Sequence, residues 1–182
     1  FKTSFSNVED FLEAIQVHLS FSKLNIENLG RVVQLFQKTN QFNLTTHRHR
    51  EENLKQLERN GGEIYAVSYE DTFGSQGIIS VITLVPEVGA LRIESWLMSC
   101  RVLNRTVEQA VFSFILEKAN GKQIRGEYIP TEKNGLVRPL YKTLGFEKVT
   151  KTHNNNNNEQ WVYANYNSEE SSPKHYASIN EI

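Results

Sequence analysis

In the first third of the chain, the spacing of hydrophobic residues changes from that of a helix to that of a strand and back to that of a helix. Apolar positions three and four residues apart predict a short helix over residues 7–16, behind a Ser-Asn capping sequence. Residues 18–24 alternate apolar and polar positions and predict a strand. Helical stripes over residues 28–40 and 48–60 predict two further helices, the second more exposed and ending at Gly61.

The rest of the pattern predicts more strands than helices. Three β-rich runs, separated by the turn sequences DTFGSQ and PEVG, indicate an antiparallel meander over residues 63–69, 77–84 and 91–99. A helix, a strand and a helix are then expected over residues 105–119, 123–129 and 135–144. Two last strands, joined by a loop that carries an asparagine run, are expected over residues 146–151 and 160–164. This order of elements is typical of an α/β fold.

The size and composition of the chain limit the number of domains that it can contain. At 182 residues and 38% hydrophobic content, the chain is long enough for one substantial core, so we expect one main domain over residues 18–166. Residues 1–17 are interpreted as a linker and helix from an upstream domain, because the chain begins with Phe rather than Met. Residues 167–182 are polar and are expected to be a disordered tail.

Charge and cysteine content exclude several classes of protein. The formal net charge is −1, with the basic residues scattered among acidic ones, so we expect no nucleic-acid partner. No apolar stretch approaches the roughly 20 residues of a membrane helix, and the first residues, FKTSFSNVEDF, have neither the basic nor the apolar region of a signal peptide. We therefore expect no membrane partner and a cytoplasmic location. The lone Cys100 excludes an internal disulfide and a cysteine cluster for structural zinc.

Four motifs together carry a resemblance to a known family. They are KTNQFNLTT at 38–46, WLMSCRVLNRTVE at 96–108, GEYIPTEKN at 126–134 and LYKTLGFEKV at 140–149. In this order they resemble the C-terminal GNAT-like half of FkbH-type proteins, over roughly residues 5–165. The resemblance implies a GNAT-like acyltransferase fold, with a central, mostly antiparallel twisted sheet flanked by helices.

The resemblance also implies a reaction and its partners. Such proteins pair this region with an upstream HAD-type domain, and make glyceryl-acyl carrier protein from 1,3-bisphosphoglycerate for polyketide-type biosynthesis. We therefore expect an acyl carrier protein and a HAD-type domain as partners, and phosphopantetheine on the carrier protein, or coenzyme A, as cofactor. The chain lacks the Asp-x-Asp-x-Thr or Asp-x-Asp-x-Val signature of a HAD unit, so we expect neither dephosphorylation nor a metal ion here.

Cys100 is the candidate nucleophile. Strand alternation predicts that Glu94, Trp96, Met98 and Cys100 share one face, where Glu94 orients a hydroxyl or relays a proton. A thiol near a helix N-terminus, beside Arg101, is expected to favour the thiolate, which is the competent nucleophile. In the related family this cysteine is the implied carrier of the glyceryl group. The alternative is a buried, inert cysteine.

The segment after Cys100 matches the GNAT pyrophosphate loop, whose pattern is Arg/Gln-x-x-Gly-x-Gly/Ala. Here it consists of Arg101, Val102, Leu103, Asn104, Arg105 and Thr106, with the two glycines replaced by Asn104 and Thr106. Because the bulkier residues hinder close approach of the backbone to a pyrophosphate, we expect a carrier-protein arm to be preferred over coenzyme A. Asn134 matches the GNAT position near the cofactor arm. Tyr141 matches the GNAT tyrosine that protonates a departing thiolate, or is a core residue.

Two further polar stretches are candidate substrate-binding sites. The first consists of Asn40, Gln41, Asn43, Thr45 and Thr46, whose side chains can hydrogen-bond glyceryl hydroxyls or can cap helices. The second follows a strand and comprises Tyr128, Thr131 and Lys133, which can meet a phosphate or form a capped turn. His47 and His49 are either a base beside the first stretch or part of a solvated helix start.

Two other functions remain open at this point. A conventional acyl-CoA-dependent N-acyltransferase transfers its acyl group without a covalent intermediate, so Cys100 is dispensable for it. A non-catalytic docking module holds the carrier protein and performs no reaction. The favoured reading is an acyltransferase domain that takes a glyceryl group onto Cys100 and passes it to the thiol of the carrier protein.

Overall fold

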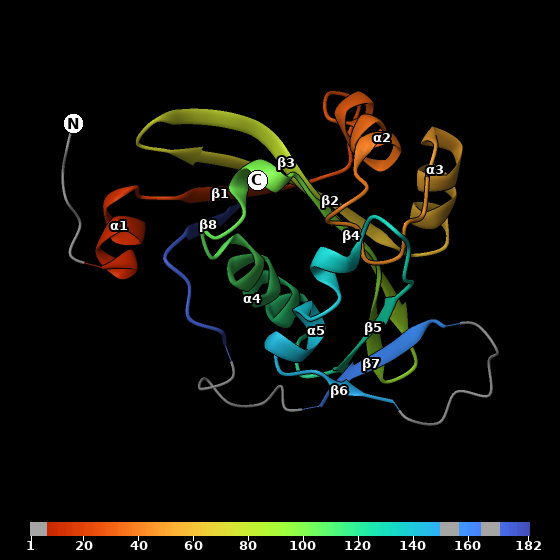
Figure 1. Cartoon of the computed structure of the whole chain (residues 1–182). Coiled ribbons are helices and arrows are strands. Elements are labelled where there is room, and N and C mark those ends of the chain that lie inside the picture. Colours follow the sequence, from red (N-terminus) through yellow and green to blue (C-terminus); the bar gives the residue numbers. More distant parts are fainter. Residues whose placement is uncertain (1–6, 150–156, 165–171) are drawn as a thin grey trace.

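The computed structural model describes residues 7–149, 157–164 and 172–182. The N-terminal half contains α1 (Val8–Ala14), β1 (His18–Lys23), α2 (Leu29–Lys38), α3 (Glu51–Arg59), β2 (Glu63–Asp71), β3 (Gly74–Glu87) and β4 (Ala90–Met98). A 3₁₀ turn (Cys100–Val102) leads to α4 (Val107–Ala119), β5 (Gln123–Tyr128), a second 3₁₀ turn (Gly135–Val137), α5 (Leu140–Thr143), β6 (Glu147–Lys148), β7 (Glu159–Tyr163) and β8 (Ser178–Glu181). Figure 1 shows their arrangement.

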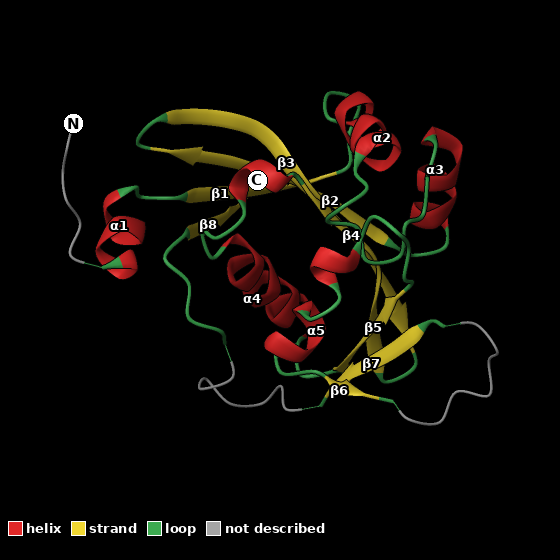
Figure 2. Cartoon of the chain, viewed as in Figure 1, coloured by secondary structure: helices red, strands yellow, loops and turns green. Residues whose placement is uncertain are grey.

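The described strands form one eight-stranded sheet in the order β6-β7-β5-β4-β3-β2-β1-β8. Neighbouring strands are antiparallel except β4 with β5 and β1 with β8. Helices α2 and α3 cover one face of the sheet, and α1, α4 and α5 lie on the other (Figures 1 and 2). The expected α/β fold, with a central, mostly antiparallel sheet flanked by helices, is confirmed.

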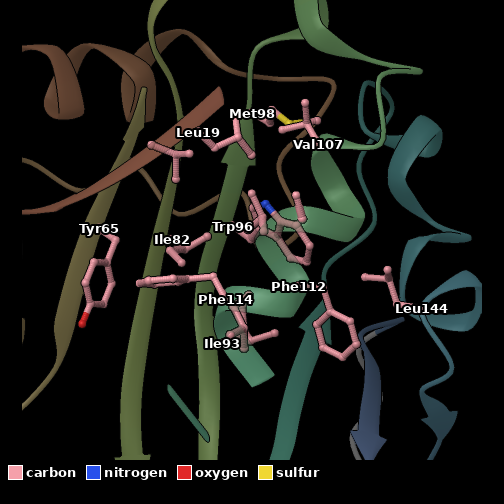
Figure 3. Close-up of a cluster of buried hydrophobic side chains, with 14 of the residues drawn as sticks. Leu19, Tyr65, Ile82, Ile93, Trp96, Met98, Val107, Phe112, Phe114 and Leu144 are labelled. Carbon is pink, nitrogen blue, oxygen red and sulfur yellow. The ribbon is translucent and has the colours of Figure 1, made fainter. Parts of the chain in front are cut away.

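Each face of the sheet has its own hydrophobic core. On the α2 and α3 face, Phe36 and Leu54 pack with Leu97 of β4. The larger core lies on the α4 face, where Phe114 stacks on Phe21 with ring centroids 4.0 Å apart. Figure 3 shows the part of this core around α4 and the central strands. The helical and two-residue periodicities of the sequence thus correspond to buried faces.

A short segment of the chain is inserted between β4 and β5. The two strands pair only where Ala90–Ile93 lies beside residues 123–126, and they diverge beyond that point. Residues 42–44 make an isolated antiparallel bridge to β4 there: the Leu44 amide donates to the Trp96 carbonyl at 3.2 Å, and the Met98 amide donates to the Phe42 carbonyl at 3.0 Å. On the other side, the Ile129 amide donates to the Leu44 carbonyl at 2.9 Å. The polar motif at 38–46 is therefore partly a piece of the sheet.

Two helices differ from the prediction at their N-termini. The helix expected over residues 135–144 is divided into a 3₁₀ turn and α5, because Pro139 between them has no amide N–H and ends the preceding turn. The helix expected from residue 48 begins at Glu51, and residues 47–49 lie outside any helix.

The prediction of a disordered C-terminal tail is wrong for residues 178–181. They form β8, which pairs in parallel with β1, and the Ser178 amide donates to the Val17 carbonyl at 2.9 Å. The edge of β1 has free backbone donors and acceptors, which this segment satisfies although its composition is polar. The predicted helix at the N-terminus is confirmed as α1, and it contributes Leu12 to the larger core. Most of the asparagine run lies outside the described residues.

None of the helices within the described ranges has both the length and the apolar composition needed to cross a membrane.

Candidate active site

Cys100 is exposed and opens into a cavity of about 690 Å³. The cavity lies between α2, the segment after it, the end of β4 and the turn after β5. Four of its lining side chains are cationic and one is acidic: Arg31, Lys38, Arg101 and Lys133 against Glu132. The predicted alternative of a buried cysteine is therefore wrong, and the thiol faces a cavity whose charge suits an anion.

The position of Cys100 follows from the end of β4. The strand stops at Met98, and Cys100 begins a 3₁₀ turn of three residues rather than the expected α-helix, which starts only at Val107. The cationic side chains, and not a helix dipole, therefore give the thiol its positive surroundings. The Cys100 thiol donates to Gln41 Oε1 at 3.1 Å, which orients its sulfur in the cavity.

The expectation that Glu94, Trp96, Met98 and Cys100 share one face is wrong, because Trp96 and Met98 belong to the α4-side core whereas Glu94 reaches His49 beside Phe36 of α2. Thr83 pairs with Ser95 but Leu84 pairs with Ile93, so Glu94 is the extra residue of a β-bulge. The bulge interrupts the alternation of β4, and Trp96 belongs to the α4-side core. Glu94 is not among the residues that line the Cys100 cavity.

Glu94 instead meets two histidines. Its Oε1 lies 2.6 Å from His47 Nδ1 and 3.0 Å from His49 Nε2, and His49 packs edge-on against Phe36 of α2. The alternative that both histidines lie on a solvated helix start is wrong, because residues 47–49 lie outside any helix and both rings contact Glu94 of β4. Hydrogen bonding to Glu94 raises the pKa of His47. Burial alone would raise the pKa of Glu94. The hydrogen bonds of the carboxylate with His47, His49 and Ser95 outweigh burial, so its pKa is lowered.

Two residues of the loop at 101–106 have a backbone that glycine adopts most readily. They are Asn104 and Thr106, which stand at the two glycine positions of the pattern and have left-handed φ values of 62° and 57°. Arg105 is not available to a ligand phosphate, because its guanidinium lies 2.6 Å from the buried Asp71 carboxylate and 2.6 Å from the Tyr69 hydroxyl.

A second cavity, of about 520 Å³, lies on the other side of this loop. It is bordered by α4, α5 and the loop, through residues that include Leu103, Asn104 and Thr106, whereas Val102 is buried. Residues close together in the inserted segment and in the loop at 101–106 face different cavities. Gln41 and Arg101 line the first cavity, and Phe42 and Leu103 line the second. The two cavities therefore flank the same pair of segments.

Asn134 does not face a cavity. Its side-chain amide is fully buried and donates to the carbonyls of Asn43 and Ile129, while its oxygen accepts from the Thr131 amide and from the Tyr128 hydroxyl. Asn134, predicted to hold the cofactor, and Asn43, Tyr128 and Thr131, predicted to hold substrate, thus join the turn after β5 to the inserted segment. The structure supports the capped-turn interpretation of these residues.

The other predicted site residues divide between the cavity and the core. Asn40, Gln41 and Lys133 line the Cys100 cavity with Arg101. Thr45 is buried, and its hydroxyl donates to the Glu94 carbonyl at 3.1 Å; Thr46 is half-buried, with its hydroxyl donating to the Thr45 carbonyl. Neither threonine lines the cavity.

Tyr141 lies in the core rather than beside Cys100. Its ring packs against Gly126 of β5, where an added Cβ would stand 2.3 Å from Cζ. The hydroxyl is buried, and burial raises its pKa. The core interpretation of Tyr141 is therefore the one that the structure supports.

Two cationic residues of the cavity were missed in the sequence. Arg31 and Lys38 lie seven residues apart in α2, so they fall on the same face of that helix. Their spacing was the available signal, but a basic pair on a surface helix is usually only solvated.

Comparison with known proteins identifies the fold. No protein-family model matches the chain, and no curated protein matches it in sequence. Among solved structures, the ribosomal-protein-S18-alanine N-acetyltransferase from Escherichia coli matches with a TM-score of 0.57 at 10% identity, over 79% of this chain and 90% of that one. A putative acetyltransferase of the GNAT family from Desulfovibrio desulfuricans matches with a TM-score of 0.59 at 11% identity, over 80% and 96%. A spermidine N-acetyltransferase from Vibrio cholerae matches with a TM-score of 0.54 at 13% identity, over 80% and 93%. The chain therefore has the fold of the GNAT N-acetyltransferases.

Proposed function

We propose that this domain is an acyltransferase that takes an activated glyceryl group onto Cys100 and passes it to the phosphopantetheine thiol of an acyl carrier protein. The observation that carries the proposal is the exposed thiol of Cys100 in a cavity lined by four cationic side chains. The motifs shared with FkbH-type proteins and the GNAT fold support the same reading.

The cavity suits a small, phosphorylated and hydroxylated acyl donor. Arg31, Lys38, Arg101 and Lys133 offer charge-assisted hydrogen bonds to a phosphate, which are stronger than neutral ones. Asn40 and Gln41 offer amide groups to hydroxyls. A glyceryl acyl phosphate, such as 1,3-bisphosphoglycerate or a form presented by a HAD-type partner, has these features.

The chemistry consists of two acyl exchanges at sulfur. In the first, the Cys100 sulfur attacks the acyl carbon, the bond from that carbon to the phosphate oxygen breaks, and the phosphate leaves with the thiol proton. In the second, the pantetheine sulfur attacks the thioester carbon and the bond to Cys100 breaks. The pantetheine proton passes to the departing sulfur, which regenerates the Cys100 thiol.

The second cavity is the proposed site of the pantetheine arm. It is bordered by Asn104 and Thr106 of the loop that matches the pyrophosphate pattern, and the adjoining residues Arg101 and Gln41 border the Cys100 cavity. Phe42 and Leu103, which line the second cavity, lie one and two residues from Gln41 and Arg101, which line the Cys100 cavity. Phe42 is almost fully buried, so we infer that its side chain turns aside for the thiols to meet.

Transfer to a carrier protein tests this function. The domain is incubated with a glyceryl donor and holo acyl carrier protein, and the carrier is analysed by mass spectrometry. We expect the wild type to load the carrier and Cys100→Ala to load none. Loading at the wild-type rate by Cys100→Ala would overturn the proposed function.

One observation favours a second candidate, a coenzyme A-dependent N-acyltransferase. Asn104 and Thr106, at the glycine positions of the pyrophosphate pattern, have the left-handed backbone that glycine favours. The spermidine N-acetyltransferase from Vibrio cholerae, which shares the fold, was solved in complex with CoA and spermine. Acyl-CoA turnover that is unaffected by Cys100→Ala, without loading of any carrier protein, would favour this candidate.

A further inference from the structure

We propose that His47, His49 and Glu94 form a binding site for a divalent transition-metal ion, with zinc as the best match. The three residues contribute two imidazole nitrogens and one carboxylate oxygen, and all of these atoms lie within 4.8 Å of one another. The site belongs to neither the Cys100 cavity nor the second cavity. It is independent of the proposed acyl transfer and departs from the expectation that the chain holds no metal.

Local backbone geometry brings the three side chains together. His47 and His49 are separated by one residue in a segment outside any helix, and both rings reach the same carboxylate oxygen of Glu94. Arg48 between them points elsewhere, and its guanidinium donates to the Phe36 carbonyl at 2.6 Å and to the Thr39 carbonyl at 2.8 Å. The bulge in β4 turns Glu94 toward the two rings.

The surroundings hold Glu94 and His49 in place. The Ser95 hydroxyl donates to Glu94 Oε2 at 2.7 Å, and His49 Nε2 lies 3.0 Å from Oε1 and 3.1 Å from Oε2 of the same carboxylate. The His49 ring is supported by the edge-on contact with Phe36, at 5.0 Å between ring centroids. Hydrogen bonds to metal ligands of this kind orient them and strengthen binding. The site is thus preorganised from residues on α2, β4 and the segment between α2 and α3.

The ligand set and its spacing match zinc. Two imidazoles and a carboxylate are the protein ligands of one class of zinc site, whereas magnesium and calcium prefer oxygen alone. A tetrahedral ion with bonds of about 2.0–2.1 Å spaces its ligand atoms roughly 3.4 Å apart. The Glu94 oxygen lies 2.6 Å and 3.0 Å from the two nitrogens, so these two pairs need to open by less than about 1 Å, and the two nitrogens lie within 4.8 Å of each other.

The burial gradient leaves room for an additional ligand. The Glu94 side chain is 7% exposed and that of His49 is 17%, but His47 is 36% exposed. The His47 side of the cluster is therefore open to a water molecule or to a small donor. Two further charges act on His47 in opposite directions, the positive charge of Arg92 and the negative charge of Glu127. The alternative to a metal site is an ion pair between protonated histidine and Glu94.

Metal titration of the chelator-treated full chain distinguishes a metal site from an ion pair. Zinc binding is followed by calorimetry, and cobalt binding by visible absorption. We expect one equivalent per chain, and affinity at least about tenfold weaker in His47→Ala and in His49→Ala. Cys100→Ala and His175→Ala, which alter a thiol and a histidine outside the cluster, are expected to bind as the wild type does.

A second readout protects the test against a variant that folds poorly. Zinc is expected to raise the midpoint of thermal unfolding of the wild type and of Cys100→Ala, but not that of His47→Gln, which keeps a polar side chain at a half-exposed position. The proposal is overturned if the wild type binds no stoichiometric metal. It is equally overturned if both His47 and His49 variants bind as tightly as the wild type, or if Cys100→Ala abolishes binding.

Discussion

The side-chain amide of Asn134 donates to the backbone carbonyl of Asn43 at 3.0 Å, across 91 positions of the sequence. This bond connects the turn after β5 to the segment inserted between β4 and β5. The Asn134 side chain is fully buried and uses both its donors and its oxygen within the chain. Two of the family-like motifs, at 38–46 and 126–134, are therefore joined by a structural contact near the candidate site.

Asn134→Ala is expected to destabilise the protein by at least about 2 kcal/mol. The substitution leaves the buried Asn43 carbonyl without its donor, at a cost of about 1–3 kcal/mol, and also removes the hydrogen bonds to the Ile129 carbonyl and from the Thr131 amide. The measurement is urea denaturation. Gln34→Ala on the exposed face of α2 is the control, with an expected change within about 0.5 kcal/mol. Equal stability of the two variants would contradict this role for Asn134.

Gly126→Ala is expected to destabilise the protein by about 1–3 kcal/mol, the usual range for overpacking. The new Cβ would stand 2.3 Å from Cζ of Tyr141, whose ring is enclosed by the core. Gly30→Ala in α2 is the matched control, because nothing lies within 4 Å of its added Cβ and alanine favours a helix. Denaturation midpoints of both variants test the contact. A neutral Gly126→Ala would show that the Tyr141 ring can move away.

Arg101 and Arg105 are expected to differ in effect, although they lie close together in sequence. Arg105→Ala leaves the Asp71 carboxylate buried without its ion-pair partner and should cost about 1–3 kcal/mol of stability, discounted for the partial exposure of Arg105. Arg101→Ala removes an exposed side chain of the Cys100 cavity, so it should leave stability unchanged and weaken binding of a phosphorylated donor. Denaturation together with donor titration at two salt concentrations separates the two roles. Equal losses of stability in Arg101→Ala and Arg105→Ala would contradict this difference in roles.

Cys100 is expected to react with iodoacetamide in the folded protein, because its thiol is exposed in the cavity. A phosphorylated glyceryl compound should slow the reaction by occupying the same cavity, and the protection should weaken in Lys133→Ala. Alkylation kinetics followed by intact mass provide the measurement. Reaction only after unfolding, or no protection by any phosphorylated compound, would contradict this account of the cavity.

Most of the fold could be predicted from the sequence because its elements are amphipathic. The stripe on α2 and the alternation in β1 each correspond to residues buried against the sheet. The division of the last helix could also have been predicted from the sequence, since Pro139 has no amide N–H to continue a helix. The pairing of residues 178–181 with β1 could not be read, because the backbone edge of another strand, and not its own polar side chains, determines it.

The candidate site was less predictable because it depends on contacts between distant segments. A bulge arises from the pairing of β4 with β3, so strict alternation wrongly placed Glu94 with Trp96 and Met98. The roles of Asn134 and Tyr141 likewise depend on partners far away in sequence, the carbonyl of Asn43 and the backbone of Gly126. Cys100 itself was identifiable from its motif, and its exposure agrees with the chemistry predicted for it.

The most direct test of the proposed function is the intact mass of the domain after incubation with an activated glyceryl donor and without carrier protein. The account predicts one glyceryl adduct per chain, located on Cys100 by peptide mapping, removed by hydroxylamine as a thioester and absent from Cys100→Ala. Addition of holo carrier protein should then shift the adduct from the domain to the carrier. Loading of the carrier protein without any adduct on Cys100, at the same rate in Cys100→Ala, would contradict the account.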